Sequence, residues 1–145
     1  STTPPLDTVA PQLRNVDLSV TRFRAARSGP SLGPTRTGIG TRVRFALTER
    51  ASVRFTVARA APGRKVGTRC VKPTAANSGH KSCTRWVRVR GSFSVTRAKG
   101  ATAVTFRGRV GGVTLKPSRY QLSLRATDSA GNRSVTKREG FRIVR

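Results

Sequence analysis

The sequence predicts an all-β chain that folds as a two-sheet antiparallel sandwich of roughly seven to eight short strands. Three observations favour this class. Apolar residues alternate with polar ones in several short stretches, and a period of two is typical of half-buried strands. Turn-forming residues, chiefly Gly, Pro, Asn and Ser, separate these stretches. No stretch has apolar residues at helical spacing. A closed barrel is the alternative arrangement of the same strands.

The length of the chain suits one domain with a single core. Residues 1–10 are polar and contain two prolines, so we expect an extended linker or docking arm there. Residues 11–145 are expected to form the domain. Its first strand is expected at 13–20, with a register shift at a bulge near Asn15.

A loop is expected over 27–40, because four glycines and two prolines interrupt any regular pattern there. Two strictly alternating strands follow, one from Arg42 to Leu47 and one from Val53 to Val57. The short segment 49–51 would join them as a turn. Residues 60–82 are expected to form a long irregular loop.

Cys70 and Cys83 are the only cysteines, and an even pair in an exported domain predicts one disulfide, which would staple this loop. On the chain-entropy model, a bridge of this span stabilises by roughly 3 kcal/mol. The alternative is two reduced thiols. We expect no metal and no cofactor, because Cys70, Cys83 and His80 would lack a fourth ligand.

Four further strands are expected, at 84–95, 103–110, 120–127 and 134–144. The strand at 120–127 alternates most clearly, with four apolar residues from Tyr120 to Ala126 on one face. Turn residues flank it on both sides.

The segments Leu-Lys-Pro-Ser-Arg-Tyr at 115–120 and Leu-Arg-Ala-Thr-Asp-Ser-Ala-Gly-Asn-Arg-Ser at 124–134 resemble the penultimate strand of bacterial secreted immunoglobulin-like and fibronectin type III-like modules. In that family the pattern is Leu-x-Pro-Gly-x-Tyr, then Ala-x-Asp-x-Ala-Gly-Asn. The resemblance implies an immunoglobulin-like sandwich and a structural tyrosine corner at Tyr120. Ser118 stands where the family has Gly. Such modules act as spacers, adhesins, carbohydrate-binding accessories or assembly domains.

The chain carries 30 Lys and Arg against 5 Asp and Glu, a net charge of +25 that should attract anionic partners. The strict alternation predicts one basic face opposite the apolar residues. Its expected members are Arg42, Arg44, Arg54, Arg88, Arg90, Arg107, Arg109, Arg125 and Arg142. Arginine binds phosphate, sulfate and carboxylate with two hydrogen bonds, so this face would suit a polyanion. The alternative is a solvated face whose arginines reflect a GC-rich genome.

Trp86 shares its predicted side with Arg88 and Arg90. It could stack on a sugar or a base. Burial in the core is the favoured interpretation, because immunoglobulin-like sandwiches often bury one Trp.

We do not expect an enzyme, because the chain has one His and five carboxylate residues with no pair at a catalytic spacing. Asp128 is interpreted as a turn residue whose carboxylate accepts backbone N–H groups. No recognition helix or zinc-finger spacing points to sequence-specific nucleic-acid binding.

The expectation is therefore a non-enzymatic, extracellular module at the surface of a bacterium, without a membrane span. It would act in adhesion or self-assembly, with copies of itself, an anionic envelope polymer, or both as partners. One alternative is a polyanion-binding protein for acidic glycan or, without sequence specificity, nucleic acid. Another is an accessory spacer domain of a larger secreted protein.

Overall fold

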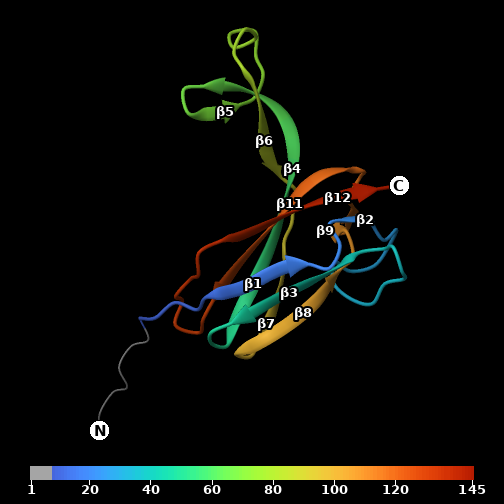
Figure 1. The fold of residues 1–145 in the computed structure, drawn as a ribbon, viewed down its shortest axis with the longest axis vertical. Helices are drawn as coiled ribbons and strands as arrows, with labels where there is room; N and C mark the ends of the chain where they lie inside the picture. The colour runs from blue at the N-terminus through green and yellow to red at the C-terminus, as the bar shows by residue number, and fades with distance from the viewer. Residues whose placement is uncertain (1–7) are drawn as a thin grey trace.

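The computed structural model describes residues 8–145, and every regular element in this part of the chain is a β-strand (Figure 1). The strands form hydrogen-bonded sheets of seven, three and two strands. No helix long and apolar enough to cross a membrane occurs in these residues. The arm expected over 1–10 falls largely outside them, since 1–7 are not among the described residues.

The seven-stranded sheet is organised around β4 (Ala51–Val66) and β11 (Ser118–Thr127), which pair antiparallel. Beyond β11 lie β12 (Lys137–Val144), which is antiparallel to it, and the short β2 (Arg22–Arg24), which is parallel to β12. Near its end, β12 is therefore hydrogen-bonded along both edges, to β11 on one side and to β2 on the other.

The sixteen residues of β4 let it pair with three further strands. Its first residues pair with β7 (Phe93–Arg97), and its middle pairs with β6 (Ser82–Arg88). Its last residues also pair with β5 (Arg69–Val71). The strand therefore extends well past the part that β11 and β7 cover.

The three-stranded sheet has the order β1 (Leu13–Leu18), β3 (Thr41–Leu47) and β8 (Gly100–Phe106), all antiparallel. The register of β1 shifts between Arg14 and Asp17. Asn15 has a positive φ of 54° at this point, which confirms the bulge predicted near it.

The smallest sheet is a hairpin of β9 (Arg109–Val110) and β10 (Val113–Thr114). Gly111 and Gly112 connect the two strands with φ values of 60° and 79°. A two-residue turn of this kind needs positive φ at both positions, which glycine adopts without strain.

The inner faces of the two larger sheets share one hydrophobic core. Phe45 of β3 and Phe55 of β4 have ring centroids 6.2 Å apart. Phe106 of β8 stacks on Phe93 of β7 at 5.3 Å. Most apolar residues predicted by alternation are buried there: Val43, Phe45, Leu47, Val53, Phe55, Val57, Val104, Phe106, Tyr120, Leu122, Leu124, Ala126, Phe141 and Ile143. Val20, beyond the end of β1, and Val87 of β6 are exposed instead.

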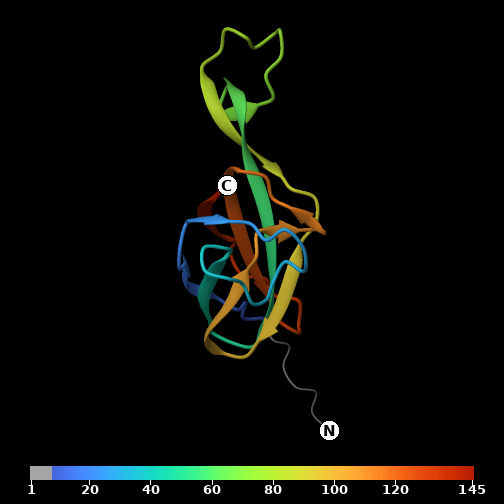
Figure 2. The same cartoon turned by 90° about the vertical axis from the view of Figure 1, so that its right-hand side faces the viewer.

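A hairpin built from the end of β4 and the start of β6 projects from the body of the molecule (Figures 1 and 2). We call residues 60–86 the hairpin arm. It also carries β5 and the loop at its tip. None of its residues belongs to the hydrophobic core.

The structure corrects several strand boundaries. The expected loop at 60–82 is wrong in its first part, because β4 continues to Val66 with β6 as its partner. The expected strand at 103–110 breaks at Gly108, which has a φ of 79° and lies too close to Ala25 to accept a Cβ atom. The expected strand at 84–95 is likewise divided into β6 and β7. These two breaks, and the unpredicted β2, β5 and β10, explain why the structure has more strands than expected.

The last strand begins at Lys137 rather than at Ser134. Ser134 instead closes the turn after β11, because its Oγ accepts the Ala126 N–H at 2.8 Å and its own N–H donates to the Ala126 carbonyl at 2.8 Å. The Asp128 carboxylate accepts the backbone N–H groups of Ala130 and Asn132, as expected for a turn residue.

Candidate binding surface

The nine arginines predicted for one basic face occupy four different places. Those on the outer face of the seven-stranded sheet are Arg54, Arg88, Arg125 and Arg142. The outer face of the three-stranded sheet holds Arg42 and Arg44, Arg107 and Arg109 bind a loop, and Arg90 follows β6 outside any strand. The prediction of one basic face for these nine arginines is therefore wrong, because alternation does not determine which sheet a strand joins.

Four arginines that the sequence analysis missed also lie on the outer face of the seven-stranded sheet. Arg24 lines the hollow beside the C-terminal residues, and the other three lie among the predicted four. Together with the predicted four, these three form what we call the basic face: Arg22, Arg54, Arg88, Arg119, Arg125, Arg138 and Arg142. Cross-strand register places them on one side, because Arg142 pairs with both Arg119 and Arg22. Arg138 lies on the same side of β12 as the predicted Arg142, opposite buried Phe141, so alternation could have identified it.

No Asp or Glu within residues 8–145 lies on the basic face. Asp17 belongs to the three-stranded sheet, where it pairs with Arg44. Glu49 and Asp128 lie in turns, and Glu139 is in register with buried Leu122 on the inner side. The field of the seven arginines is therefore not neutralised on their own face.

Four of these arginines surround a shallow depression of about 270 Å³. Arg54 and Arg125 lie opposite each other on β4 and β11, with Arg88 and Arg138 beside them. The short uncharged side chains of this depression include Thr56, Ser123 and Thr136. Converging guanidinium groups over such a floor suit a ligand that carries several negative charges.

Trp86 is exposed, which overturns its favoured burial in the core. Its side chain retains 39% of its accessible surface. The reason is its register, because Trp86 pairs with Ala60 on the outer face of the seven-stranded sheet, which points away from the core. Trp86 lies on the same side as the basic face, and the Arg119 guanidinium carbon is 5.6 Å from the centre of its ring. This distance corresponds to a cation–π contact.

Arg107 and Arg109 make structural hydrogen bonds within the protein. Their guanidinium groups donate to the loop that runs over 27–34 and to the β9–β10 turn, and Arg109 also donates to Thr114 Oγ1. The carbonyl acceptors, at 2.7 to 3.3 Å, are those of Arg27, Ser28, Gly29, Pro30, Pro34 and Gly112. Because these bonds occupy most of their donors, few remain for an outside anion.

The three-stranded sheet offers a weaker basic surface. Arg44 binds the Asp17 carboxylate with two hydrogen bonds, at 2.9 and 3.1 Å, so its charge is compensated. Arg42 is exposed, and its neighbour across β8 is Thr105. This side therefore resembles an ordinary solvated surface.

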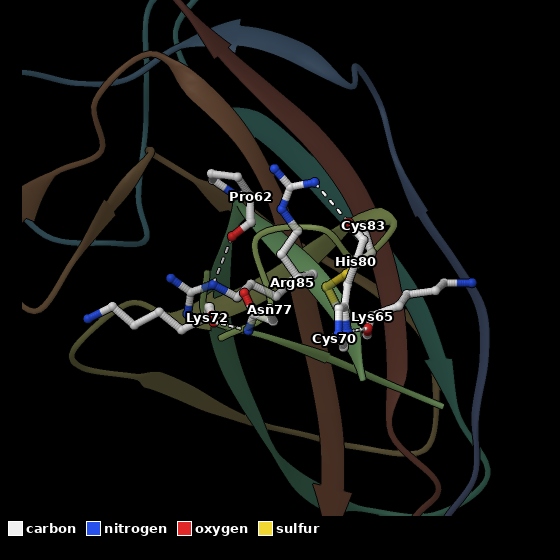
Figure 3. The surroundings of a disulfide bond; sticks show 9 residues. Pro62, Lys65, Cys70, Lys72, Asn77, His80, Cys83 and Arg85 are labelled. Atoms are coloured by element: carbon white, nitrogen blue, oxygen red, sulfur yellow. Dashed lines mark hydrogen bonds between the residues drawn. A yellow bond between two sulfur atoms is a disulfide. The ribbon is translucent and has the colours of Figure 1, made fainter. Parts of the chain in front are cut away.

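The hairpin arm is held by a disulfide between Cys70 and Cys83, as predicted (Figure 3). Gly63 lies against the bridge so closely that a Cβ atom there would collide with Cys70 Sγ. Buried Asn77 orders the tip, since its Oδ1 accepts the Thr74 N–H at 2.8 Å and its Nδ2 donates to a carbonyl at 3.0 Å. A disulfide indicates a non-reducing environment.

The His80 ring also belongs to the structure of the arm. Its Nδ1 lies 2.7 Å from the Lys65 carbonyl oxygen and donates to it, since a carbonyl can only accept (Figure 3). The arm contains six Lys and Arg residues and no Asp or Glu. It is therefore a cationic projection.

Tyr120 makes the contact that the resemblance implies. Its hydroxyl donates to the Lys116 carbonyl at 2.6 Å, four residues upstream, and its side chain is buried. Burial raises the pKa of the Tyr120 phenol above its usual value of 10.0, against the opposing charge of Arg59.

A hollow of about 1090 Å³ lies where the loop over 25–39 approaches the C-terminal residues. Leu115 and Ile143 contribute apolar surface to it, and Arg24, Arg36 and Arg145 contribute charge. It is open and mostly bounded by loops. It extends the cationic surface without bringing together a set of reactive groups.

Within residues 8–145, no three His, Cys, Asp or Glu side chains come close enough together to hold a metal ion. Neither a known protein-family model nor a curated protein sequence matches this chain.

Proposed function

We propose that this chain is a non-enzymatic, exported immunoglobulin-like module of a bacterial cell surface, and that its basic face adheres to an anionic envelope polymer. One observation carries this proposal. Seven arginines from five strands lie on one side of one sheet, and no carboxylate of residues 8–145 shares that side.

The physical argument begins with repulsion among these charges. Neighbouring strands are about 4.7–4.9 Å apart, so arginines in register repel one another unless an anion lies between them. A polymer with many negative groups relieves this repulsion at several positions at once. It also releases the counterions that each partner holds, which makes its binding depend steeply on salt.

The immunoglobulin-like assignment is supported by two sheets that share one core and by the hydrogen bond from Tyr120 to Lys116. Two features differ from antibody domains. The disulfide staples the hairpin arm rather than the two sheets, and Trp86 is exposed rather than packed against it. Export is supported by the disulfide itself.

Self-assembly is the competing role, through copies that meet at strand edges. A net charge of +25 opposes the approach of identical chains in the absence of an anion. We therefore expect the purified chain to be monomeric at physiological salt. Large particles without added polymer would favour assembly instead.

The test compares two triple variants in a salt series. Arg54→Ser, Arg125→Ser and Arg138→Ser remove charge from the basic face, and Arg14→Ser, Arg42→Ser and Arg44→Ser remove the same charge from the opposite sheet. Binding of a polyuronate and of inorganic polyphosphate is measured by calorimetry for both. The basic-face variant should bind more weakly, and the slope of its plot of log K against log salt concentration should be smaller by about two to three. The control variant should retain most of the affinity and most of the slope. Equal losses would mean that net charge, not this face, binds the polymer.

A further inference from the structure

One row of side chains crosses the basic face from strand to strand and ends at Trp86. Register places Arg22 of β2 beside Arg142 of β12, and Arg142 beside Arg119 of β11. On β4 the row continues at Ala60, which pairs with Trp86 of β6. Three cations and one indole ring therefore lie in a line perpendicular to the strands.

Ala60 is the reason that the arginines and the ring can act together. Its small side chain leaves room above β4, and Arg119 reaches across to within 5.6 Å of the Trp86 ring centre. A hollow of about 320 Å³ adjoins this contact, between Pro62 and Thr84 of the hairpin arm and Ser118, Arg119 and Arg142 of the body. The row thus combines an apolar ring with guanidinium groups, and the hollow lined by Arg119 and Arg142 leaves space beside them.

This combination selects among polyanions. Polyphosphate offers charge but nothing to pack on an indole ring. Proteins that bind single-stranded nucleic acid stack successive bases on several aromatic side chains. Here Trp86 is the one aromatic residue on this face within residues 8–145, since Tyr120 is buried and all six Phe contribute to the core. A sugar ring bearing an acidic group needs one apolar platform and adjacent arginines.

We propose that the bound polymer is an acidic polysaccharide, one sugar ring of which packs on Trp86 while its carboxylate or sulfate groups bind Arg119 and Arg142. This inference rests on the proposed function and names its ligand class. The disulfide indicates a non-reducing environment such as the outside of a cell, where acidic polysaccharides occur.

The test uses the fluorescence of Trp86, which is the only Trp in the chain. Polygalacturonate should shift its emission, and polyphosphate of matched charge should bind without this shift. Trp86→Leu should weaken polygalacturonate binding at least about fivefold, a loss typical of one stacked ring, and leave polyphosphate binding within about twofold. Val87→Ala, on the other side of β6, is the matched control and should affect neither. Arg119→Lys keeps the charge but loses the planar fork, and should also weaken polygalacturonate binding.

The outcomes separate the two proposals. Polygalacturonate binding with unchanged emission and unaffected by Trp86→Leu would overturn this inference and leave the basic face as a polymer site. If single-stranded DNA shifts the Trp86 emission and polygalacturonate does not, the acidic-polysaccharide inference is overturned in favour of nucleic acid. No binding of any polyanion would remove the proposed function itself.

Discussion

Arg54 of β4 and Arg125 of β11 lie directly opposite each other on the outer face of the seven-stranded sheet. The Cβ atoms of such a pair are about 4.5–5.5 Å apart, where like charges destabilise a sheet. Arg125 also donates to the Ser134 carbonyl at 3.1 Å. Arg54 is therefore the partner whose replacement tests the repulsion with least disturbance.

Arg54→Thr should raise the free energy of unfolding by about 0.2–1 kcal/mol at low salt, because it removes a like-charge pair and Thr suits a strand. The gain should vanish at about 1 M salt, where the Debye length is about 3 Å. Urea denaturation at both salt concentrations measures it. Arg42→Thr is the control, since Arg42 faces Thr105 across the strand rather than another arginine. An equal gain in the control would attribute the effect to net charge.

Alternation predicted the buried faces well, because a strand turns successive side chains to opposite sides whatever its partner. Leu122 and Leu124 are fully buried as expected. The same pattern could not assign strands to sheets, so Arg42 and Arg54 looked equivalent although they lie on different sheets. Register is a long-range property, and the row that joins Arg119 to Trp86 depends on it.

The hairpin arm was missed for a different reason. Pro62 and Gly63 are unfavourable within strands, and their neighbours do not alternate clearly. Pairing with β6 and the disulfide hold this part of β4 extended. The hydrogen bonds of Arg107 and Arg109 could not be predicted either, because the loop that accepts them lies some eighty residues away along the chain. Alternation alone therefore placed both residues on the surface.

Arg109→Lys should destabilise the fold by about 1.5–3 kcal/mol, the range for hydrogen bonds that involve a charged group. Lysine keeps the charge, but it cannot reach the Gly29 and Gly112 carbonyls and Thr114 at once. Thermal or urea unfolding measures the loss. Arg42→Lys should change stability by less than about 0.5 kcal/mol. Polymer affinity should be nearly unchanged for folded Arg109→Lys; a loss matching that of the basic-face triple variant would place Arg109 in the binding surface.

Reduction of the Cys70–Cys83 disulfide should loosen the hairpin arm and leave the body folded. The arm contributes no residue to the hydrophobic core, so its local order depends on strand pairing, the bridge and the Asn77 contacts. Trypsin should cut between Arg64 and Lys81 much faster in Cys70→Ser/Cys83→Ser than in the oxidised protein, while hydrogen exchange in β11 stays slow. Exchange that accelerates equally in both regions would show instead that the arm and the body unfold as one unit.

Tyr120→Phe should lower the free energy of unfolding by about 1–1.5 kcal/mol near neutral pH, because the Lys116 carbonyl loses its donor. The raised pKa of Tyr120 adds a pH dependence with a definite sign. Above pH 10 the unfolded chain loses the phenol proton first, while the folded protein retains it, so the unfolded state binds fewer protons and stability falls as pH rises. The contribution is complete below the unfolded pKa and is lost as pH passes through the folded pKa. Tyr120→Phe lacks this contribution, so the stability difference between the two proteins should shrink as the pH rises above 10.0 in urea titrations. Both proteins share every Lys and Arg, which cancels the titration of those groups, and a difference that stays constant with pH would contradict a raised pKa.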